Sequence, residues 1–253
     1  MAEKSIFWPE LVDGKADQGE VAKLYNVHGT PDLFVIDRAG NIAARLRSAK
    51  LLDQQLAEVA ATDSFPPRTR RDTWQRPVAV MDELGIAAGS AVADVGAGGG
   101  YFTFRLAARV GSKGKVYAQD LDEKALAGIR EQAQKDKIAQ VETIHGGEDD
   151  PKLPASALDA ILVVDAYHEF IRAEAMMDSF LRALKPGGRL GVIDHPARLG
   201  LPPAEYRERH NLPQEKLIEQ AARSGLRLLS FASAFAGPPG ETQSYFAVFE
   251  KPR

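Results

Sequence analysis

A glycine-rich stretch at residues 92–103 narrows the choice of folds more than any other part of the sequence. It reads VADVGAGGGYFT, a short apolar run with an acid, followed by four glycines within five positions. The apolar run predicts a buried strand, and the glycines predict a turn where a ligand lies against the backbone. The spacing differs from the G-x-G-x-x-G of dinucleotide-binding turns, and no G-K-[ST] follows as in a P-loop. The stretch therefore predicts another kind of nucleotide-like ligand.

Strand-like and helix-like segments alternate from this stretch onward, which favours an α/β fold with a parallel sheet covered on both faces. We expect strands at residues 90–96, 114–120, 141–146, 158–170, 186–195, 226–235 and 243–252. We expect helices at residues 101–110, 121–137, 173–185 and 213–225. The last two strands are joined by a loop too short for a crossover helix, so we expect them to pair antiparallel at the sheet edge.

An acid ends the second of these strands. Asp120 follows Gly96 at about the 20-residue spacing at which doubly wound sheets place a ribose-binding carboxylate. Ligands of such sheets bind at the carboxyl ends of the strands, near the point where the strand order reverses. Both the glycine turn and Asp120 are expected there, so together they predict a ligand that carries a ribose.

Composition excludes several classes of protein. The 253 residues carry a formal net charge of -3, so no general basic field attracts nucleic acid or anionic lipid. The chain has 0 cysteines, which excludes disulfides, thiolate metal ligands and cysteine nucleophiles. No apolar run approaches the roughly 20 residues that span a bilayer, and the first residues do not resemble a signal peptide. We expect a cytoplasmic protein with no membrane or nucleic-acid partner.

Four segments resemble, in their order, the successive motifs of class I S-adenosylmethionine-dependent methyltransferases. They are VADVGAGGGYFT, VYAQDLD, LDAILVVDAYHEF and LRALKPGGRLGVIDH. The resemblance runs from about Trp74 to Lys251 and implies a Rossmann-like sheet of seven strands with an antiparallel last strand. It also implies S-adenosyl-L-methionine as the cofactor and a small-molecule methyl acceptor, which the sequence does not identify.

The resemblance assigns cofactor-binding roles to residues of the first motif and of the fourth strand. Asp94 and the backbone of Gly96, Ala97 and Gly98 would face the amino-acid part of the cofactor. Asp165, at the end of the fourth strand, would lie near the methionine moiety and the acceptor. These assignments place the reacting methyl group between the first and fourth strands.

The same resemblance assigns the nucleoside part of the cofactor to the second and third strands. Asp120 would hold the ribose, and Leu121 would lie against the adenine. Glu148 or Asp149 would meet the adenine amino group, although Gly147 and Asp150 compete for this role. The alternative for these acids is a solvated turn with no role in binding.

Methyl transfer to a hydroxyl or a protonated amine also needs a group that takes up a proton. The segment DAYHEF offers His168 as the first choice, Tyr167 to orient the acceptor, and Asp165 to favour the imidazolium. His195 is the second choice, and His145 and His210 receive less weight. These site residues are predictions from position at the strand ends alone.

A metal-dependent reaction is an alternative for the same strand ends. Asp165, His168, Asp194 and His195 offer carboxylate and imidazole groups that suit a divalent ion. Their spacing does not match the pattern required of such a site, so we expect no metal.

Residues 1–62 resemble the C-terminal half of a thioredoxin-like domain that lacks its Cys-x-x-Cys half. The segments LFVID and IAARL, at 33–37 and 42–46, predict a β-hairpin, and a helix follows at 51–60. The Thr30-Pro31 bond matches a cis bond of that family. A hairpin with a bare edge needs a partner, so we expect a homodimer or packing on the second domain. The alternative is a remnant with no role.

A linker is predicted at residues 63–73, where prolines and the basic RTRR cluster break the pattern, and the methyltransferase domain at 74–253.

Two other functions compete with methyl transfer to a small molecule. A regulatory or assembly protein would bind the cofactor without transferring its methyl group. Nucleic-acid methylation is disfavoured because DAYHEF stands where an Asn-Pro-Pro-Tyr type of motif would, whereas a protein acceptor stays open.

Overall fold

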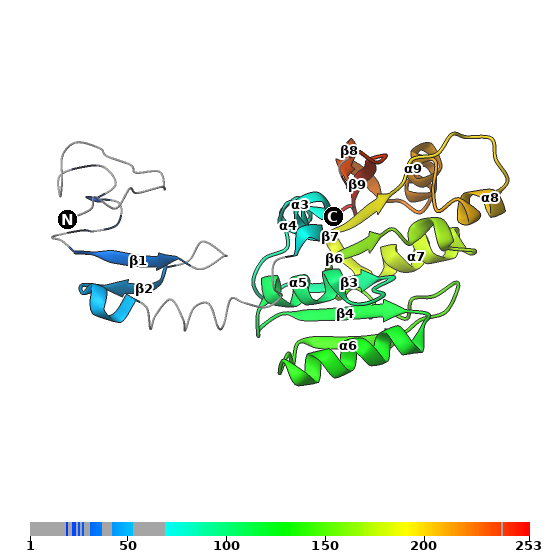
Figure 1. Ribbon diagram of the computed structural model, residues 1–253. Coiled ribbons are helices and arrows are strands. Elements are labelled where there is room, and N and C mark those ends of the chain that lie inside the picture. Colours follow the sequence, from blue (N-terminus) through cyan, green and yellow to red (C-terminus); the bar gives the residue numbers. More distant parts are fainter. Residues whose placement is uncertain are drawn as a thin grey trace. The chain divides into compact units, whose positions relative to one another are not determined.

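The computed structural model divides the chain into two compact units, Met1–Ser64 and Phe65–Arg253 (Figure 1). The residues that it describes are 19, 22–23, 25, 27, 31–36, 42–52, 69–238 and 240–253. Within this part of the chain, no helix combines the length and the apolar character needed to cross a membrane. The second unit contains the glycine-rich stretch.

The first unit contains the predicted hairpin. Strand β1 (Leu33–Ile36) pairs antiparallel with β2 (Ile42–Leu46), and a short 3-10 helix, η2 (Ala49–Leu51), follows. Val35 and Leu46 are buried, and Arg45 forms an ion pair with Asp32, whose side chain is 1% exposed. The two strands thus form a sheet that buries an apolar residue from each strand.

Other predictions for the first unit fall outside the described residues. These are the turn at 38–41, the helix at 51–60 beyond its first two residues, and Thr30 with its bond to Pro31. The described residues of this unit form a hairpin, one 3-10 turn and a helical pair at 22–23, so the thioredoxin-like half domain is not confirmed.

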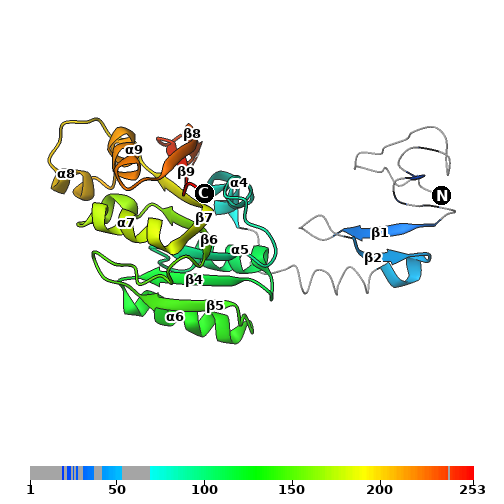
Figure 2. The same ribbon diagram turned by 180° about the vertical axis from the view of Figure 1, so that it is seen from behind.

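The second unit is built on a seven-stranded sheet in the order β5-β4-β3-β6-β7-β9-β8 (Figures 1 and 2). Its strands are β3 Ala91–Val95, β4 Lys115–Asp120, β5 Val141–His145, β6 Leu158–Val164, β7 Leu184–Asp194, β8 Arg227–Ala236 and β9 Ser244–Glu250. Neighbouring strands are parallel from β5 to β7, whereas β9 is antiparallel to both β7 and β8. The predicted Rossmann-like α/β sheet with an antiparallel last strand is confirmed.

Helices cover both faces of this sheet. The helices are α3 Arg70–Gln75, α4 Pro77–Glu83, α5 Tyr101–Val110, α6 Glu123–Lys135, α7 Ala173–Ala183, α8 Pro203–Glu208 and α9 Gln214–Arg223. Apolar residues of α4, α5 and α6 form the core on one face, and those of α7 and α9 form it on the other. The amphipathic patterns of these helices therefore match the two-sided burial of the strands.

Helices α3, α4 and α8 were not predicted. Helix α3 makes the described part of the predicted linker, residues 69–73, largely helical. Thr69 and Asp72 explain its start, because the backbone N–H of Thr69 donates to the Asp72 side chain at 3.2 Å. Helix α4 begins at Pro77, and α8, in the insert after β7, begins after Pro202. Both starts fit the preference of the first helical turn for proline.

Candidate functional site

The strand order of the sheet reverses at β3, whose neighbours are β4 on one side and β6 on the other. A cavity of about 310 Å³ opens at the carboxyl ends of these strands, where doubly wound sheets bind ligands. It is lined by the glycine turn after β3, the end of β4, the turn after β5 and the segment after β6. We call it the strand-end cavity.

The glycine turn needs glycine for two different reasons. Gly96 has φ +72°, and a Cβ added there would lie 2.5 Å from the Cβ of Ala166. Gly98 has φ +50°, but a Cβ added there would meet nothing within 4 Å. The missing side chain at position 98 therefore leaves space in the lining of the cavity. The N–H groups of Gly96 and Ala97 both donate to the carbonyl of Gln119. The glycine at position 96 is therefore required by the protein's own packing, whereas the one at 98 leaves room for a ligand.

Asp120 connects the glycine turn to the end of β4. Its Oδ2 accepts the N–H of Gly98 at 2.7 Å, and its Oδ1 accepts the N–H of Asp122 at 2.9 Å. Each oxygen keeps a second lone pair for a ligand hydroxyl. The next residue, Leu121, lines the cavity with 52% of its surface exposed. A carboxylate beside an exposed apolar side chain suits a ribose joined to a flat base.

Asp94 lies behind the turn and is not among the residues that line the strand-end cavity. Its buried Oδ2 accepts the hydroxyl of Thr103 at 2.6 Å. Burial raises the pKa of Asp94 to about 6, against the opposing effect of the Thr103 hydrogen bonds. Any influence of this carboxylate on a ligand depends on its charge state near neutral pH.

Of the acids after β5, Glu148 is the one that lines the cavity, together with Gly147. Asp149 is not among the lining residues, and the carbonyl of Asp150 accepts the N–H of Gly147 at 2.7 Å. The two candidates for the adenine amino group are thus placed differently, with Glu148 toward the cavity.

Asp165 follows β6 and lines the strand-end cavity. Its backbone has φ +55°, an unusual value for a residue other than glycine, and its N–H donates to the carbonyl of Ile193. His195, after β7, lies behind it with Nε2 3.5 Å from Asp165 Oδ1 and Nδ1 3.3 Å from the hydroxyl of Ser244. The pair brings an acid and an imidazole to the edge of the cavity.

His168 lies shortly after β6, at the strand end where it was predicted, but its side chain does not line the strand-end cavity. Its side chain is 1% exposed, and its Nδ1 lies 2.9 Å from Oδ1 of the fully buried Asp194. Its Nε2 lies 3.1 Å from Nδ1 of His210. Burial lowers the pKa of His168, but the hydrogen bond and charge of Asp194 outweigh this, so the pKa is raised overall. Asp194, rather than Asp165, is therefore the carboxylate that orients this imidazole.

A second cavity, of about 550 Å³, lies between α7, α8, α9 and the 3-10 helix η3 (Tyr167–Glu169). We call it the helix-side pocket. His168 and Tyr167 line this pocket and not the strand-end cavity, and the Tyr167 hydroxyl donates to the side chain of Gln220 at 3.1 Å. Phe170 and Ile171 line both cavities, so the two are neighbours that share part of a wall.

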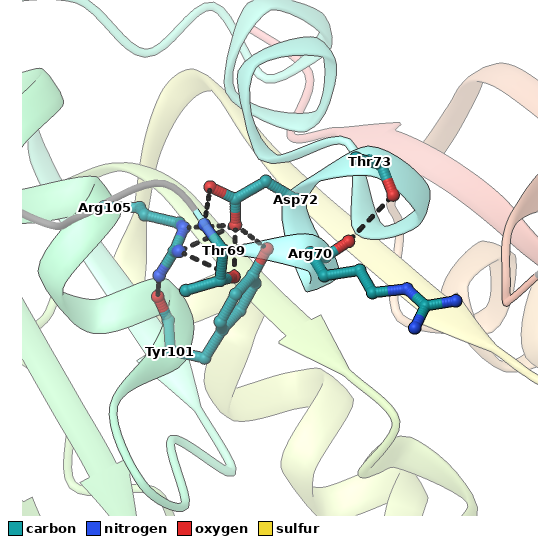
Figure 3. A network of polar contacts seen from close by, with 6 residues as sticks. All are labelled: Thr69, Arg70, Asp72, Thr73, Tyr101 and Arg105. Atoms are coloured by element: carbon teal, nitrogen blue, oxygen red, sulfur yellow. Dashed lines mark hydrogen bonds and ion pairs between the residues drawn. The ribbon is translucent and has the colours of Figure 1, made fainter.

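A polar network fixes α3 to the first turn of α5, directly after the glycine turn (Figure 3). Asp72 Oδ1 accepts the hydroxyl of Tyr101 at 2.6 Å and Nη2 of Arg105 at 2.6 Å. Partial burial raises the pKa of Asp72, but hydrogen bonds from Tyr101 and Thr69 and the charge of Arg105 outweigh this and leave it lowered. Arg71 lies over the Tyr101 ring, 4.1 Å from its centre. The network holds the helix that follows the turn in place.

Sequence reasoning assigned no role to Asp72 and little weight to His210. The pattern Thr69-x-x-Asp72 is a helix-start signal that the neighbouring basic cluster obscured. No local signal points to His210, which is 42 positions from His168 along the chain. The other low-weight histidine, His145, is exposed, and its Nε2 lies 3.0 Å from the carbonyl of Leu121.

The family model and the curated relatives that match this chain are both described as methyltransferases. Residues 92–188 match the model of a family described as a methyltransferase domain. The ubiquinone/menaquinone biosynthesis C-methyltransferase UbiE of Escherichia fergusonii is 30% identical over 122 residues, and that of a Marinomonas strain is 27% identical. Each match covers 48% of this chain and 48% of the relative, so the chain spans about half the length of these curated relatives.

Solved structures extend the likeness over most of the second unit. A SAM-dependent methyltransferase from Aquifex aeolicus has a TM-score of 0.61 and 25% identity, covering 72% of this chain and 92% of that one. Phosphoethanolamine N-methyltransferase 2 of Haemonchus contortus, in complex with S-adenosyl-L-methionine, has a TM-score of 0.57 and 18% identity. That match covers 71% of this chain and 53% of the other, and it bears on the fold alone.

Proposed function

We propose that the second unit is a class I S-adenosylmethionine-dependent methyltransferase domain and that it transfers the methyl group of the cofactor to a small molecule, as the matching family model, relatives and solved structures support. The observation that carries the proposal is the strand-end cavity at the point where the strand order reverses. The glycine turn, the carboxylate of Asp120 and the exposed side chain of Leu121 lie next to one another there, an arrangement that suits a nucleoside. S-adenosyl-L-methionine supplies an electrophilic methyl group on its sulfonium.

Different residues of the cavity hold different parts of the cofactor. Asp120 accepts hydrogen bonds from the ribose, Leu121 contacts the adenine, and Glu148 accepts from its amino group. Gly98 leaves space for the amino-acid part, and the charge of Asp94 favours the ammonium group from behind the turn. Support for these roles comes from the lining of the cavity and from the free lone pairs of the Asp120 carboxylate.

The acceptor enters from the helix-side pocket and approaches the methyl group past the shared wall. Basic side chains at Arg172, Arg207 and Lys216 and acidic ones at Glu174 and Asp178 line this pocket, so we expect a polar acceptor. Four separate segments line the helix-side pocket and bound it on several sides, which supports a small molecule as the acceptor.

Proton uptake is assigned to the pair of Asp165 and His195. Asp165 reaches the strand-end cavity, and Nε2 of His195 lies 3.5 Å from its Oδ1, near enough for the imidazole to act with this carboxylate. His168 lines the helix-side pocket, but 1% of its side chain is exposed and both ring nitrogens are paired, so we do not assign proton uptake to it. The role predicted first for His168 therefore passes to His195.

A single assay separates this function from cofactor binding without catalysis. The purified chain is incubated with S-adenosyl-L-methionine labelled in the methyl group and with pools of polar metabolites, and the labelled product is isolated. Transfer of label to a metabolite supports the enzyme. Tight binding of S-adenosylhomocysteine with no transfer to any pool, or to the chain itself, supports a regulatory or assembly protein.

Quinone C-methylation is a second candidate, favoured by the 30% identity over 122 residues to relatives of that name. Carbon acceptors must also lose a proton after methyl transfer, which the pair of Asp165 and His195 would accept. A quinol that lacks the methyl group, added to the same assay, tests this candidate. Label on a ring carbon would establish it, and label found only on other metabolites would exclude it.

For the first unit, we propose a thioredoxin-like half domain that pairs with a second copy through β1 or β2. The support is an antiparallel hairpin with a buried side at Val35 and Leu46 and with no further strand paired to it among the described residues. Light scattering is expected to give the mass of a dimer. A monomer at high micromolar concentration would contradict the pairing.

A further inference from the structure

Three side chains that could bind a metal ion converge at η3, which contributes residues to the lining of both cavities. They are His168, Glu169 and His210, whose potential ligand atoms all lie within 4.8 Å of one another. The Nε2 of His168 is 3.1 Å from the Nδ1 of His210, and the Glu169 Oε1 is 3.9 Å from each of these nitrogens. Glu169 lines the strand-end cavity, and His168 lines the helix-side pocket.

The other nitrogen of His168 is held as it is in histidines that bind metals. Its Nδ1 lies 2.9 Å from the buried Asp194, which also accepts the backbone N–H of His168 at 3.0 Å. A metal-ligating histidine usually donates its second N–H to a carboxylate, which fixes the ring and the tautomer. With Nδ1 as the donor, the lone pair of neutral His168 is at Nε2 and faces His210.

The distances fit a shared ion. Zinc binds imidazole nitrogens at about 2.0–2.1 Å, so two such ligands at near-tetrahedral angles lie a little more than 3 Å apart. The observed 3.1 Å between the nitrogens of His168 and His210 is close to this separation. His210 and Glu169 are both exposed, so their side chains can turn toward an ion while the buried His168 stays fixed.

We propose that His168, Glu169 and His210 form a binding site for a divalent transition-metal ion such as zinc. Two imidazoles and one carboxylate are a donor set that zinc and its neighbours prefer over calcium or magnesium. Three protein ligands leave a coordination position open. The site shares His168 with the four residues considered from the sequence. Of those four, Asp165, His168 and Asp194 also have potential ligand atoms within 4.8 Å of one another, but Asp194 is paired with Nδ1 of His168 and Asp165 lies 3.5 Å from His195.

Metal binding by the purified full-length chain tests the site independently of any methyl transfer. The chain is treated with a chelator, dialysed, and titrated with Zn²⁺ by calorimetry and with Co²⁺ by visible absorption. We expect one ion per chain and a d–d spectrum with Co²⁺. His210→Ala, an exposed change, should remove both signals without loss of the circular dichroism spectrum.

A matched control is available at His145, which is exposed and whose Nδ1 lies 4.0 Å from Glu123. His145→Ala should bind Zn²⁺ and Co²⁺ as the unaltered chain does. Asp194→Asn should weaken Zn²⁺ binding by about 10–100-fold through the orientation of His168. Absence of binding by the unaltered chain, or equal affinities of the unaltered and His210→Ala chains, would overturn the proposal.

Discussion

The strand-end cavity and the helix-side pocket are neighbours, but they are formed by different kinds of structural element. The first is formed by turns that directly follow β3, β4, β5 and β6, and much of its chemistry comes from backbone and from Asp120. The second is formed by side chains of η3, α7, α8 and α9, which come from separate parts of the chain. A site made of turns at strand ends is determined by local sequence, whereas one made between helices is determined by packing.

This contrast is consistent with the proposed division of the site, with the cofactor in the strand-end cavity and the acceptor in the helix-side pocket. The sheet places its strand ends in fixed positions, so a glycine turn and one carboxylate are sufficient for a nucleoside. The helices of the second pocket are free to vary in their outward side chains without disturbing that frame. One domain can therefore keep a constant cofactor and use a different acceptor.

The largest effect is expected at Gly96. In Gly96→Val, the added side chain would collide with Ala166, whose Cβ would be 2.5 Å away, and the residue would be strained at φ +72°. Binding of S-adenosylhomocysteine should be abolished because the turn is displaced. Gly98→Ala, where a Cβ meets no protein atom within 4 Å, is the control and should weaken binding without loss of thermal stability comparable to that of Gly96→Val. Equal melting temperatures of the two variants would contradict the packing conflict expected at Gly96.

A smaller effect is expected at the pair of Asp165 and His195, of which Asp165 lines the strand-end cavity. His195→Ala should lower kcat by roughly 10²–10⁴-fold for an acceptor that loses a proton, because Asp165 loses its partner. The affinity for S-adenosylhomocysteine should be nearly unchanged, since His195 does not line the strand-end cavity. Steady-state kinetics with His168→Ala alongside decides between the two histidines. A loss of kcat confined to His168→Ala would identify the buried His168 as the group that takes up the proton.

The smallest of these effects concerns Asp94 and depends on pH. The pKa of Asp94, about 6, lies above the usual 3.8, so its protonated form contributes to the free energy of unfolding. This contribution is complete below pH 3.8 and is lost as the pH rises through 6. At neutral pH, Asp94→Asn should therefore raise the free energy of unfolding, by on the order of 1–3 kcal/mol. The ionised form favours the cofactor ammonium, so affinity should fall as pH drops below 6 and should not do so in Asp94→Asn. Denaturant unfolding and titrations at several pH values measure both, and a destabilised variant would refute burial as the cause of the raised pKa.

The sheet and the position of the strand-end cavity could be predicted from sequence because their signals are local. The apolar run before Gly96 and the acid at Asp120 each appear within one short segment, and their spacing alone indicates adjacent strand ends. The parallel sheet and the antiparallel β9 followed from the alternation of segments and from a short final loop. Helix α3 was missed because exposed arginines around Thr69 concealed a capping signal.

The placement of His168 could not be predicted, because its partners are distant in sequence. Asp194 is 26 positions away and His210 is 42 positions away, and only the folding of β7 and the insert after it against η3 brings them together. The sequence showed that His168 follows a strand end but not which way its ring turns. Asp165 was expected to favour the charged form of His168, and its charge does help to raise the pKa of His168, although the hydrogen bond and charge of Asp194 contribute more. The contact of Asp165 with His195 was not expected.

We expect the cofactor to bind in the strand-end cavity and the acceptor in the pocket beside it. Calorimetric titration of S-adenosylhomocysteine into three chains tests this most directly: unaltered, Asp120→Ala, and Lys216→Ala from the helix-side pocket. We predict one site per chain, with affinity lowered roughly tenfold to a few hundredfold in Asp120→Ala by the loss of charge-assisted hydrogen bonds. Lys216→Ala should bind as the unaltered chain does. No binding by the unaltered chain at millimolar ligand, or equal affinity in Asp120→Ala, would contradict this assignment of the two cavities.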